Sequence, residues 1–239
     1  MARAAASETS VDRLVAHLVG GRAADALAME LGAWLGGSAR FRAFADAHRD
    51  KIRKKLRTAP DADALRDVRA ELRVAYLLLT DRRIDLAFEA YGAGRGGPDF
   101  TVTFRAEQPF NVEVTRLRGT PTPGALAGSV LAKLRQLPPS LPNALLIAIE
   151  GARPSTADVD AAARSLRARA DAGEATLLSR GHFDGTRAFY ERYLRLGVVL
   201  AWAEASPGEA GAAAWINRSA RIAIPERGLR ACLAALRAG

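Results

Sequence analysis

Two acidic side chains, Asp99 and Glu113, stand where neighbouring strands would carry them to a common point. Asp99 follows a proline and opens a run of alternating apolar residues, while Glu113 lies between two valines in a second such run. Hard cations such as Mg²⁺ are held by one or two carboxylates together with waters and substrate phosphates. The pair therefore predicts a metal site of the kind that hydrolyses phosphodiesters.

Each acid also has a purely structural interpretation. Asp99 follows Pro98 and would serve as a turn residue whose carboxylate bonds nearby backbone groups. Glu113 lies among apolar neighbours, where an unpaired carboxylate is expensive, so it requires a metal ion or a basic partner. An arginine salt bridge is the main competitor of the metal, and we favour the metal.

The surroundings of the two acids resemble the PD-(D/E)xK nuclease superfamily, which has the restriction-endonuclease-like fold. The residues that carry the resemblance are Pro98-Asp99 and Glu113-Val114-Thr115, within a stretch of roughly residues 65 to 150. In that family a lysine stands two positions after the second acid, whereas this chain has Thr115 there. The resemblance also implies that Glu71 corresponds to a glutamate that the family carries on its first core helix.

A substitute for the missing lysine is needed, because a threonine hydroxyl orients water but supplies no positive charge. Lys133 is the best candidate, since Ser129, Lys133 and Gln136 share one flank of a predicted helix. Helix-borne lysines replace the strand lysine in some members of the resembled superfamily. The alternative for Lys133 is a surface lysine that lays its stem on apolar neighbours.

These considerations define a candidate catalytic set and its cofactor. The set is Glu71, Asp99, Glu113, Thr115, Lys133 and Gln136. Asp99 and Glu113 are expected to hold Mg²⁺ or Mn²⁺, and Glu71 is expected to support the ion directly or through water. Lys133 supplies the cation, and Thr115 and Gln136 orient water or substrate.

The order of predicted elements supports the same fold. Apolar residues at helical spacing after Pro60 predict a helix over 61–79. Strands are predicted at 84–90, 99–104, 110–116 and 144–149, a glycine-rich turn at 91–98, and a helix at 125–137. Helix, three strands, helix and strand is the core order of the resembled nuclease fold. The continuous apolar run at 144–149 predicts a strand that is buried on both faces.

We therefore expect an α/β protein with a restriction-endonuclease-like core, in which helices flank a mixed central sheet. Residues 1–60 are predicted to form a helical N-terminal extension, and 61–150 the nuclease-like core. Residues 151–239 are predicted to form an α/β C-terminal extension of the same domain. Its predicted elements are helices at 157–170, 183–194 and 225–237, and strands at 197–203 and 212–217. Trp202 and Trp215, one in each strand, are expected to pack as a cross-strand pair in the core.

Basic residues suggest where nucleic acid would bind. The candidate phosphate contacts are Lys51, Arg53, Lys54, Lys55, Arg116 and Arg118. Strand alternation sends Arg116 and Arg118 to the face opposite Glu113. For the cluster at 51–55, a solvated helix end that complements the helix dipole is an equal alternative.

Composition adds weak support for a polyanionic partner. The chain has 35 Lys and Arg against 26 Asp and Glu, a formal net charge of +9. Without a charged and apolar leader or a run long enough to cross a bilayer, a cytoplasmic protein without membrane contact is expected. A homodimer is compatible with the fold, because many of its nucleases pair to cut both strands.

The predicted function is metal-dependent hydrolysis of nucleic acid, with DNA as the expected substrate. The alternative is a catalytically inactive nuclease-fold module that binds nucleic acid or a protein partner. A third interpretation is that the resemblance is accidental and that the sheet serves an unrelated binding role. A sheet order in which the strands of Asp99 and Glu113 are not neighbours would reveal it.

Overall fold

The computed structural model of the chain describes residues 2–20, 25–91, 97–151, 153–204 and 211–238. Contacts divide the chain into two units, unit 1 (residues 1–82) and unit 2 (residues 83–239). Most of the glycine-rich turn expected at 91–98 falls outside the described residues. Of the helices in the described part of the chain, none combines the length and the apolar character that a bilayer crossing requires.

Unit 1 is helical. Its elements are α1 (Ala2–Val19), α2 (Asp25–Gly37), α3 (Ala39–Ala47), α4 (Arg49–Thr58) and α5 (Ala62–Leu78). Helix α5 begins at the predicted place, because the Asp61 side chain accepts a hydrogen bond from the Ala64 backbone N–H at 2.8 Å. The helices pack through buried apolar side chains, among them Leu31, Leu35 and Phe41.

The boundary between the two units lies between residues 82 and 83. The sequence analysis places the boundary between the N-terminal extension and the core between residues 60 and 61. Helix α5 belongs with the N-terminal helices because its side chains complete their core. Tyr76 on α5 stacks on Trp34 of α2 with ring centroids 5.8 Å apart. Arg69 on α5 also donates to both carboxylate oxygens of Glu30, at 2.6 and 2.7 Å.

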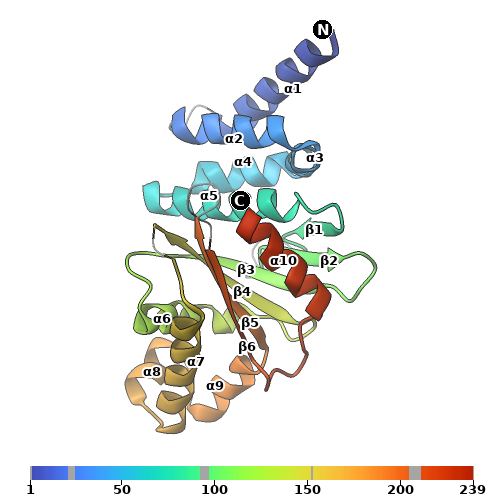
Figure 1. Cartoon of the computed structure of the whole chain (residues 1–239). Helices are drawn as coiled ribbons and strands as arrows, with labels where there is room; N and C mark the ends of the chain where they lie inside the picture. The colour runs from blue at the N-terminus through green and yellow to red at the C-terminus, as the bar shows by residue number, and fades with distance from the viewer. Residues whose placement is uncertain (1, 21–24, 92–96, 152, 205–210, 239) are drawn as a thin grey trace. The chain divides into compact units, whose positions relative to one another are not determined.

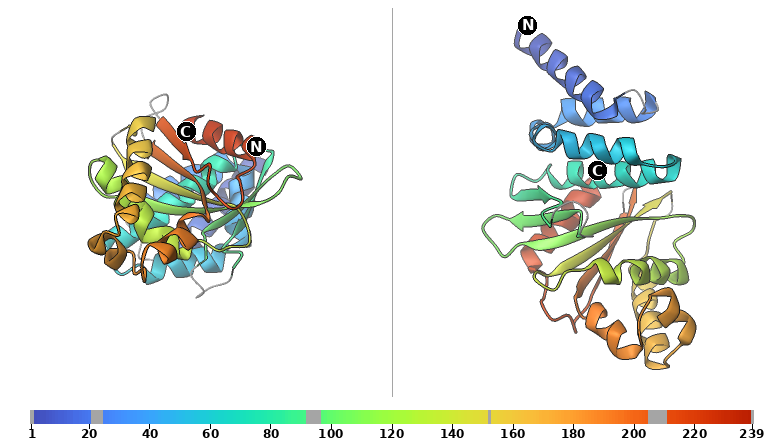
Figure 2. Two further views of the ribbon diagram at one scale, coloured as in Figure 1. Left: turned by 90° about the horizontal axis from the view of Figure 1, so that it is seen from below. Right: turned by 180° about the vertical axis from the view of Figure 1, so that it is seen from behind.

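Unit 2 is an α/β unit built on a mixed sheet, drawn in Figures 1 and 2. Its strands are β1 (Ile84–Phe88), β2 (Phe100–Phe104), β3 (Phe110–Leu117), β4 (Asn143–Glu150), β5 (Leu196–Glu204) and β6 (Gly211–Ile216). In the described residues the sheet has six strands in sequence order. The pairs β3–β4 and β4–β5 are parallel, and the pairs β1–β2, β2–β3 and β5–β6 are antiparallel.

Helices cover both faces of this sheet. They are α6 (Pro123–Lys133), the short 3₁₀ turn η1 (Leu134–Gln136), α7 (Thr156–Asp171), α8 (Ala175–Arg180), α9 (Thr186–Tyr193) and α10 (Glu226–Ala238). Helices α6, α7 and α9 bury one face, with Leu145 and Val199 in the same apolar cluster. Helix α10 lies on the other face (Figure 1), where Trp202 Nε1 donates to the Leu236 carbonyl at 2.9 Å.

The expected strands and their order are confirmed, including the doubly buried β4, in which each residue except Glu150 is buried. The short helix α8 is missing from the sequence prediction, because its six residues are too few to show a helical repeat of apolar residues. The expectation that Trp202 and Trp215 pack as a cross-strand pair is wrong. Trp202 lies opposite Ala212 and Trp215 opposite Val199, so the two rings occupy different rows and different faces of the sheet.

The buried Tyr193 gives a test of the packing in unit 2. Its ring stacks on Phe189 at 5.3 Å, and only 1% of the residue is exposed. Burial raises the pKa of its phenol well above the ordinary value, and its hydroxyl oxygen has no hydrogen-bond partner among the described residues. Tyr193→Phe removes this unpaired polar group, so we expect the free energy of unfolding to rise by about 1 kcal/mol in urea titrations.

Tyr190→Phe is the matched control, because the Tyr190 hydroxyl donates to Asp171 Oδ1 at 2.5 Å. That variant loses a made hydrogen bond and is expected to lose stability. A Tyr193→Phe variant less stable than the native chain would contradict the described packing.

Candidate functional site

Strands β2 and β3 bring the two predicted acids together. The strands are antiparallel neighbours with Phe100 opposite Val112, so continuing the register by one position sets Asp99 opposite Glu113. Both acids are buried, with 9% of Asp99 and 4% of Glu113 exposed. The expectation that their strands are adjacent is confirmed.

Asp99 is held where the two strands stop pairing. The register ends at Phe100 and Val112, and Asp99 Oδ2 accepts a hydrogen bond from the Val114 backbone N–H at 2.9 Å. The carboxylate thus takes the place of a backbone carbonyl beside β3. This contact involves one carboxylate oxygen, and a carboxylate offers about four lone-pair sites, so it is compatible with metal binding.

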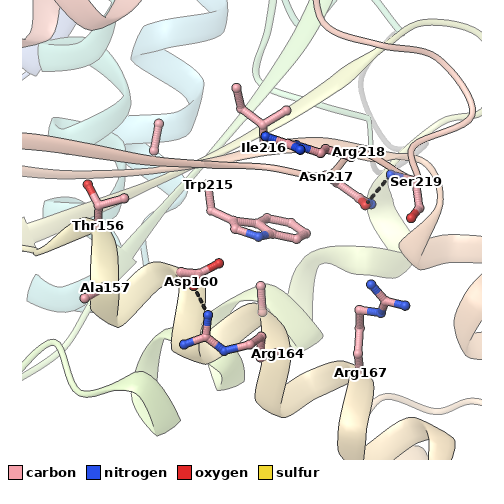
Figure 3. A pocket seen from close by; sticks show the side chains of 12 residues that line it. Thr156, Ala157, Asp160, Arg164, Arg167, Trp215, Ile216, Asn217, Arg218 and Ser219 are labelled. Atoms are coloured by element: carbon pink, nitrogen blue, oxygen red, sulfur yellow. Dashed lines mark hydrogen bonds and ion pairs between the residues drawn. The ribbon is translucent and has the colours of Figure 1, made fainter.

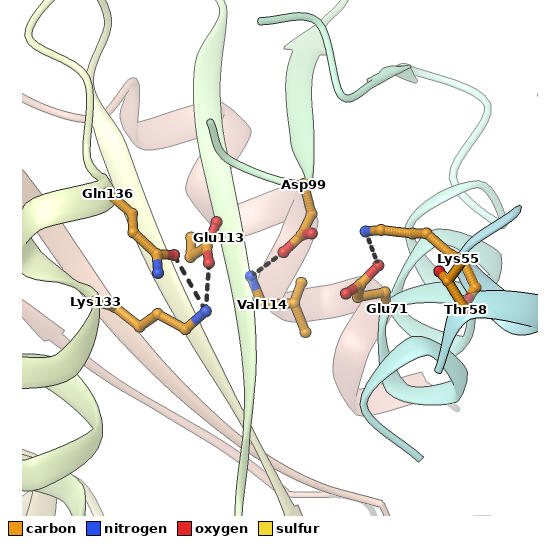
Figure 4. A network of polar contacts seen from close by, with 8 residues as sticks. All are labelled: Lys55, Thr58, Glu71, Asp99, Glu113, Val114, Lys133 and Gln136. Atoms are coloured by element: carbon orange, nitrogen blue, oxygen red, sulfur yellow. Dashed lines mark hydrogen bonds and ion pairs between the residues drawn. The ribbon is translucent and has the colours of Figure 1, made fainter. Parts of the chain in front are cut away.

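Glu113 forms an ion pair with Lys133. Lys133 Nζ donates to Glu113 Oε1 at 2.7 Å and to Gln136 Oε1 at 3.2 Å, so one ammonium joins the strand acid to η1 (Figure 4). The Glu113 side chain is 4% exposed and that of Lys133 25%. A helix-borne lysine therefore lies at the acid, as the sequence predicts.

Thr115 lies two positions after Glu113 on β3, so it shares the face of Glu113. Its side chain has no charge to offer to Glu113. The cation at the acid comes from the helix that follows the strand, and not from the position that the family motif assigns to it.

A polar network that the sequence analysis missed lies beside the acids. Asn111 Nδ2 donates to Asn143 Oδ1 at 3.0 Å and to the Tyr91 hydroxyl at 3.1 Å, and Thr101 Oγ1 donates to Asn111 Oδ1 at 3.1 Å. Residues 111, 113 and 115 are polar and alternate with the apolar residues 110, 112 and 114 of β3. This alternation was the available signal for a polar row on one face of β3.

In unit 1, Glu71 pairs with a basic residue. Lys55 Nζ donates to Glu71 Oε2 at 2.5 Å, with side-chain exposures of 26% and 14% (Figure 4). The predicted support of a metal by Glu71 stays a prediction. Lys55 is engaged by this carboxylate, whereas Lys51 and Lys54 are exposed.

The strand arginines differ in accessibility. The Arg116 side chain is 4% exposed and pairs with Glu150 at 3.3 Å, so it has little surface to offer a phosphate. Arg118 follows the end of β3 and is exposed. Of these two predicted phosphate contacts, Arg118 is the accessible one.

The donors of unit 2 suit a hard divalent cation. Asp99 and Glu113 supply oxygen ligands, and Mg²⁺ uses one or two carboxylates together with waters and substrate phosphates. In the described part of the chain, no group of three or more His, Cys, Asp or Glu side chains is arranged to hold a metal ion. A two-carboxylate site that substrate phosphates complete remains consistent with this donor set.

Comparisons of the chain with the profiles of known protein families, with curated proteins and with solved structures give no match.

The ion pair between Glu113 and Lys133 makes a quantitative prediction. Lys133→Met keeps the apolar stem but leaves the buried carboxylate without its ammonium, so the free energy of unfolding should fall by about 3 kcal/mol. Glu113→Gln removes the buried charge and should cost about 1 kcal/mol. The double variant should cost less than the sum of the two, as measured by urea unfolding at pH 7.

Arg135→Met is the control, because Arg135 is an exposed basic residue in the 3₁₀ turn η1, which directly follows Lys133. Its stability should change by less than about 0.5 kcal/mol. Strictly additive effects of the Glu113 and Lys133 substitutions would show that the pair does not stabilise the fold.

Proposed function

We propose that unit 2 is a metal-dependent phosphodiesterase of restriction-endonuclease-like fold. Its proposed substrate is nucleic acid, with DNA preferred. The observation that carries the proposal is that Asp99, directly before β2, binds the Val114 backbone of β3 next to Glu113, whose carboxylate lies 2.7 Å from the Lys133 ammonium. An acid pair beside a lysine is the residue combination of the PD-(D/E)xK superfamily. The order of elements along the chain, α5, then β1 to β3, then α6 and β4, supports the same assignment.

Asp99 and Glu113 would hold Mg²⁺ or Mn²⁺ in this proposal. The cation supplies Lewis-acid polarisation of the phosphodiester and makes water more acidic. Lys133, held at Glu113, keeps a positive charge where negative charge develops on the phosphate. Its contact with Gln136 fixes the ammonium without neutralising it, because an amide oxygen carries no net charge.

Burial of the acid pair supports catalysis as well as structure. A charge acts more strongly in a site from which water is excluded, because screening there is weaker than in bulk solvent. The polar row of β3 adds Asn111, fixed by Asn143, and Thr115, which would orient water or substrate. The net charge of +9 favours a polyanionic substrate.

The second candidate is a catalytically inactive module of the same fold that binds nucleic acid or a protein. Thr115 in place of the motif lysine is the observation that favours it. A position of Lys133 far from the acids would also favour the inactive module. The 2.7 Å contact between Lys133 and Glu113 does not give that support.

Cleavage assays on fluorescent single-stranded and duplex DNA, with Mg²⁺ or Mn²⁺, test the proposal. Asp99→Ala and Glu113→Gln should reduce cleavage below detection, because each removes a metal ligand. Lys133→Met should lower the rate by about 100-fold to 1000-fold, the usual cost of losing a preorganised charge-stabilising group. EDTA should abolish cleavage by the native chain.

Asp184→Ala is the matched control, since Asp184 is an exposed acid of unit 2 away from β2 and β3. Cleavage that persists in Asp99→Ala would overturn the assignment of the site. A native chain that binds DNA but does not cleave it with either metal would establish the inactive module.

A further inference from the structure

A groove on unit 2 lies apart from the acid pair. It runs between α7 and the edge strand β6, and its cavity volume is about 620 Å³ (Figure 3). Trp215 on β6 lies in the same row of the sheet as Glu113, connected through Leu145 and Val199. Three strand spacings of about 4.8 Å separate the two positions by about 14 Å. The groove is therefore a second site on the same face of the sheet.

Trp215 forms the floor of this groove. Its ring projects between β6 and α7 (Figure 3) and packs against the buried Tyr193, with ring centroids 6.2 Å apart. This support keeps the indole fixed, while the residue stays partly exposed. Ile216 next to it is 56% exposed, an unusual degree for a large apolar residue. An aromatic ring fixed in the floor of a groove offers a surface on which another flat ring can stack.

Cations surround the aromatic floor. Arg164 and Arg167 project from α7 and are exposed, and Arg218 is exposed after the end of β6. Arg164 pairs with Asp160 in the groove. Three arginines and one aspartate give the lining a net charge of +2.

The groove thus combines a stacking surface with an excess of positive charge. A planar base that carries a phosphate matches both features, because a base stacks on an aromatic side chain and arginine binds phosphate oxygens. The faces of paired bases are occupied by their neighbours in a duplex, so an indole in a groove reaches only an unpaired base. The volume lies in the usual range of small-ligand sites.

We propose that this groove binds an unpaired nucleotide, whose base stacks on Trp215 and whose phosphate is bound by Arg167. Figure 3 draws Arg164 and Arg167 on the α7 side of Trp215, and Arg218 with Ile216 across β6 from the ring. Arg218 is therefore placed for a neighbouring phosphate of a strand. The nucleotide belongs either to single-stranded nucleic acid or to a free mononucleotide. Binding here requires neither metal nor cleavage, so the inference stands apart from the proposed hydrolysis.

The inference is tested by measuring how fluorescein-labelled oligothymidylate binds to the full chain. The fluorescence anisotropy of the label reports binding, and EDTA in the buffer prevents metal-dependent cleavage. Trp215→Leu should weaken binding by about 10-fold to 100-fold and Trp215→Phe by less, because the smaller ring still stacks. Arg167→Ala should weaken binding and flatten its dependence on salt. Arg187→Ala, an arginine 92% exposed on α9, is the control and should bind as the native chain does.

Unlabelled thymidine monophosphate and duplex DNA serve as competitors. Displacement by the monophosphate at concentrations comparable to the oligonucleotide assigns the groove to free nucleotides, and much weaker displacement assigns it to a strand. Both results support the nucleotide site. Duplex that competes as well as single strand, absence of binding by the native chain, or native affinity in both Trp215→Phe and Arg167→Ala overturns it. The last criterion does not depend on whether Trp215→Leu folds.

Discussion

The burial of the Glu113 carboxylate is the constraint on which the candidate site depends. A buried carboxylate without a counter-charge costs several kcal/mol, so strand β3 is compatible with this acid only when a cation is close. Lys133 fills that requirement at 2.7 Å, from a helix that follows β3 in the chain. The same contact defines the site, because it fixes an ammonium beside an acid whose strand neighbour, Asp99, is also buried.

In this arrangement the positive charge at the acid does not come from the position that the family motif assigns to it. In the resembled nucleases the cation comes from the strand, two positions after the acid, and here that position is Thr115. A lysine on α6 reaches the same carboxylate from a different backbone position, because α6 packs on the face to which Glu113 projects. In the proposed function, Lys133 takes the role of the motif lysine and supplies the positive charge for phosphodiester hydrolysis.

Sequence patterns predicted the strands and most helices of unit 2 well, because alternation and apolar runs there agree with burial. Lys133 was found because helical spacing placed it with Gln136. The network around Asn111 was missed, because its partners Tyr91, Thr101 and Asn143 are far apart in sequence and meet only in the sheet. The groove at Trp215 was missed for a related reason. An apolar strand sequence predicts burial but does not show that β6 is an edge.

Calorimetric titration of Mn²⁺ into the native chain and three variants tests the central claim most directly, namely that Asp99 and Glu113 form one cation site that Lys133 shares. The account predicts that Asp99→Asn and Glu113→Gln abolish binding. It also predicts that Lys133→Met tightens binding, because the ammonium and the metal ion repel each other at the same carboxylate. Tight binding that survives in Asp99→Asn and Glu113→Gln, or that is lost in Lys133→Met alone, would contradict the claim.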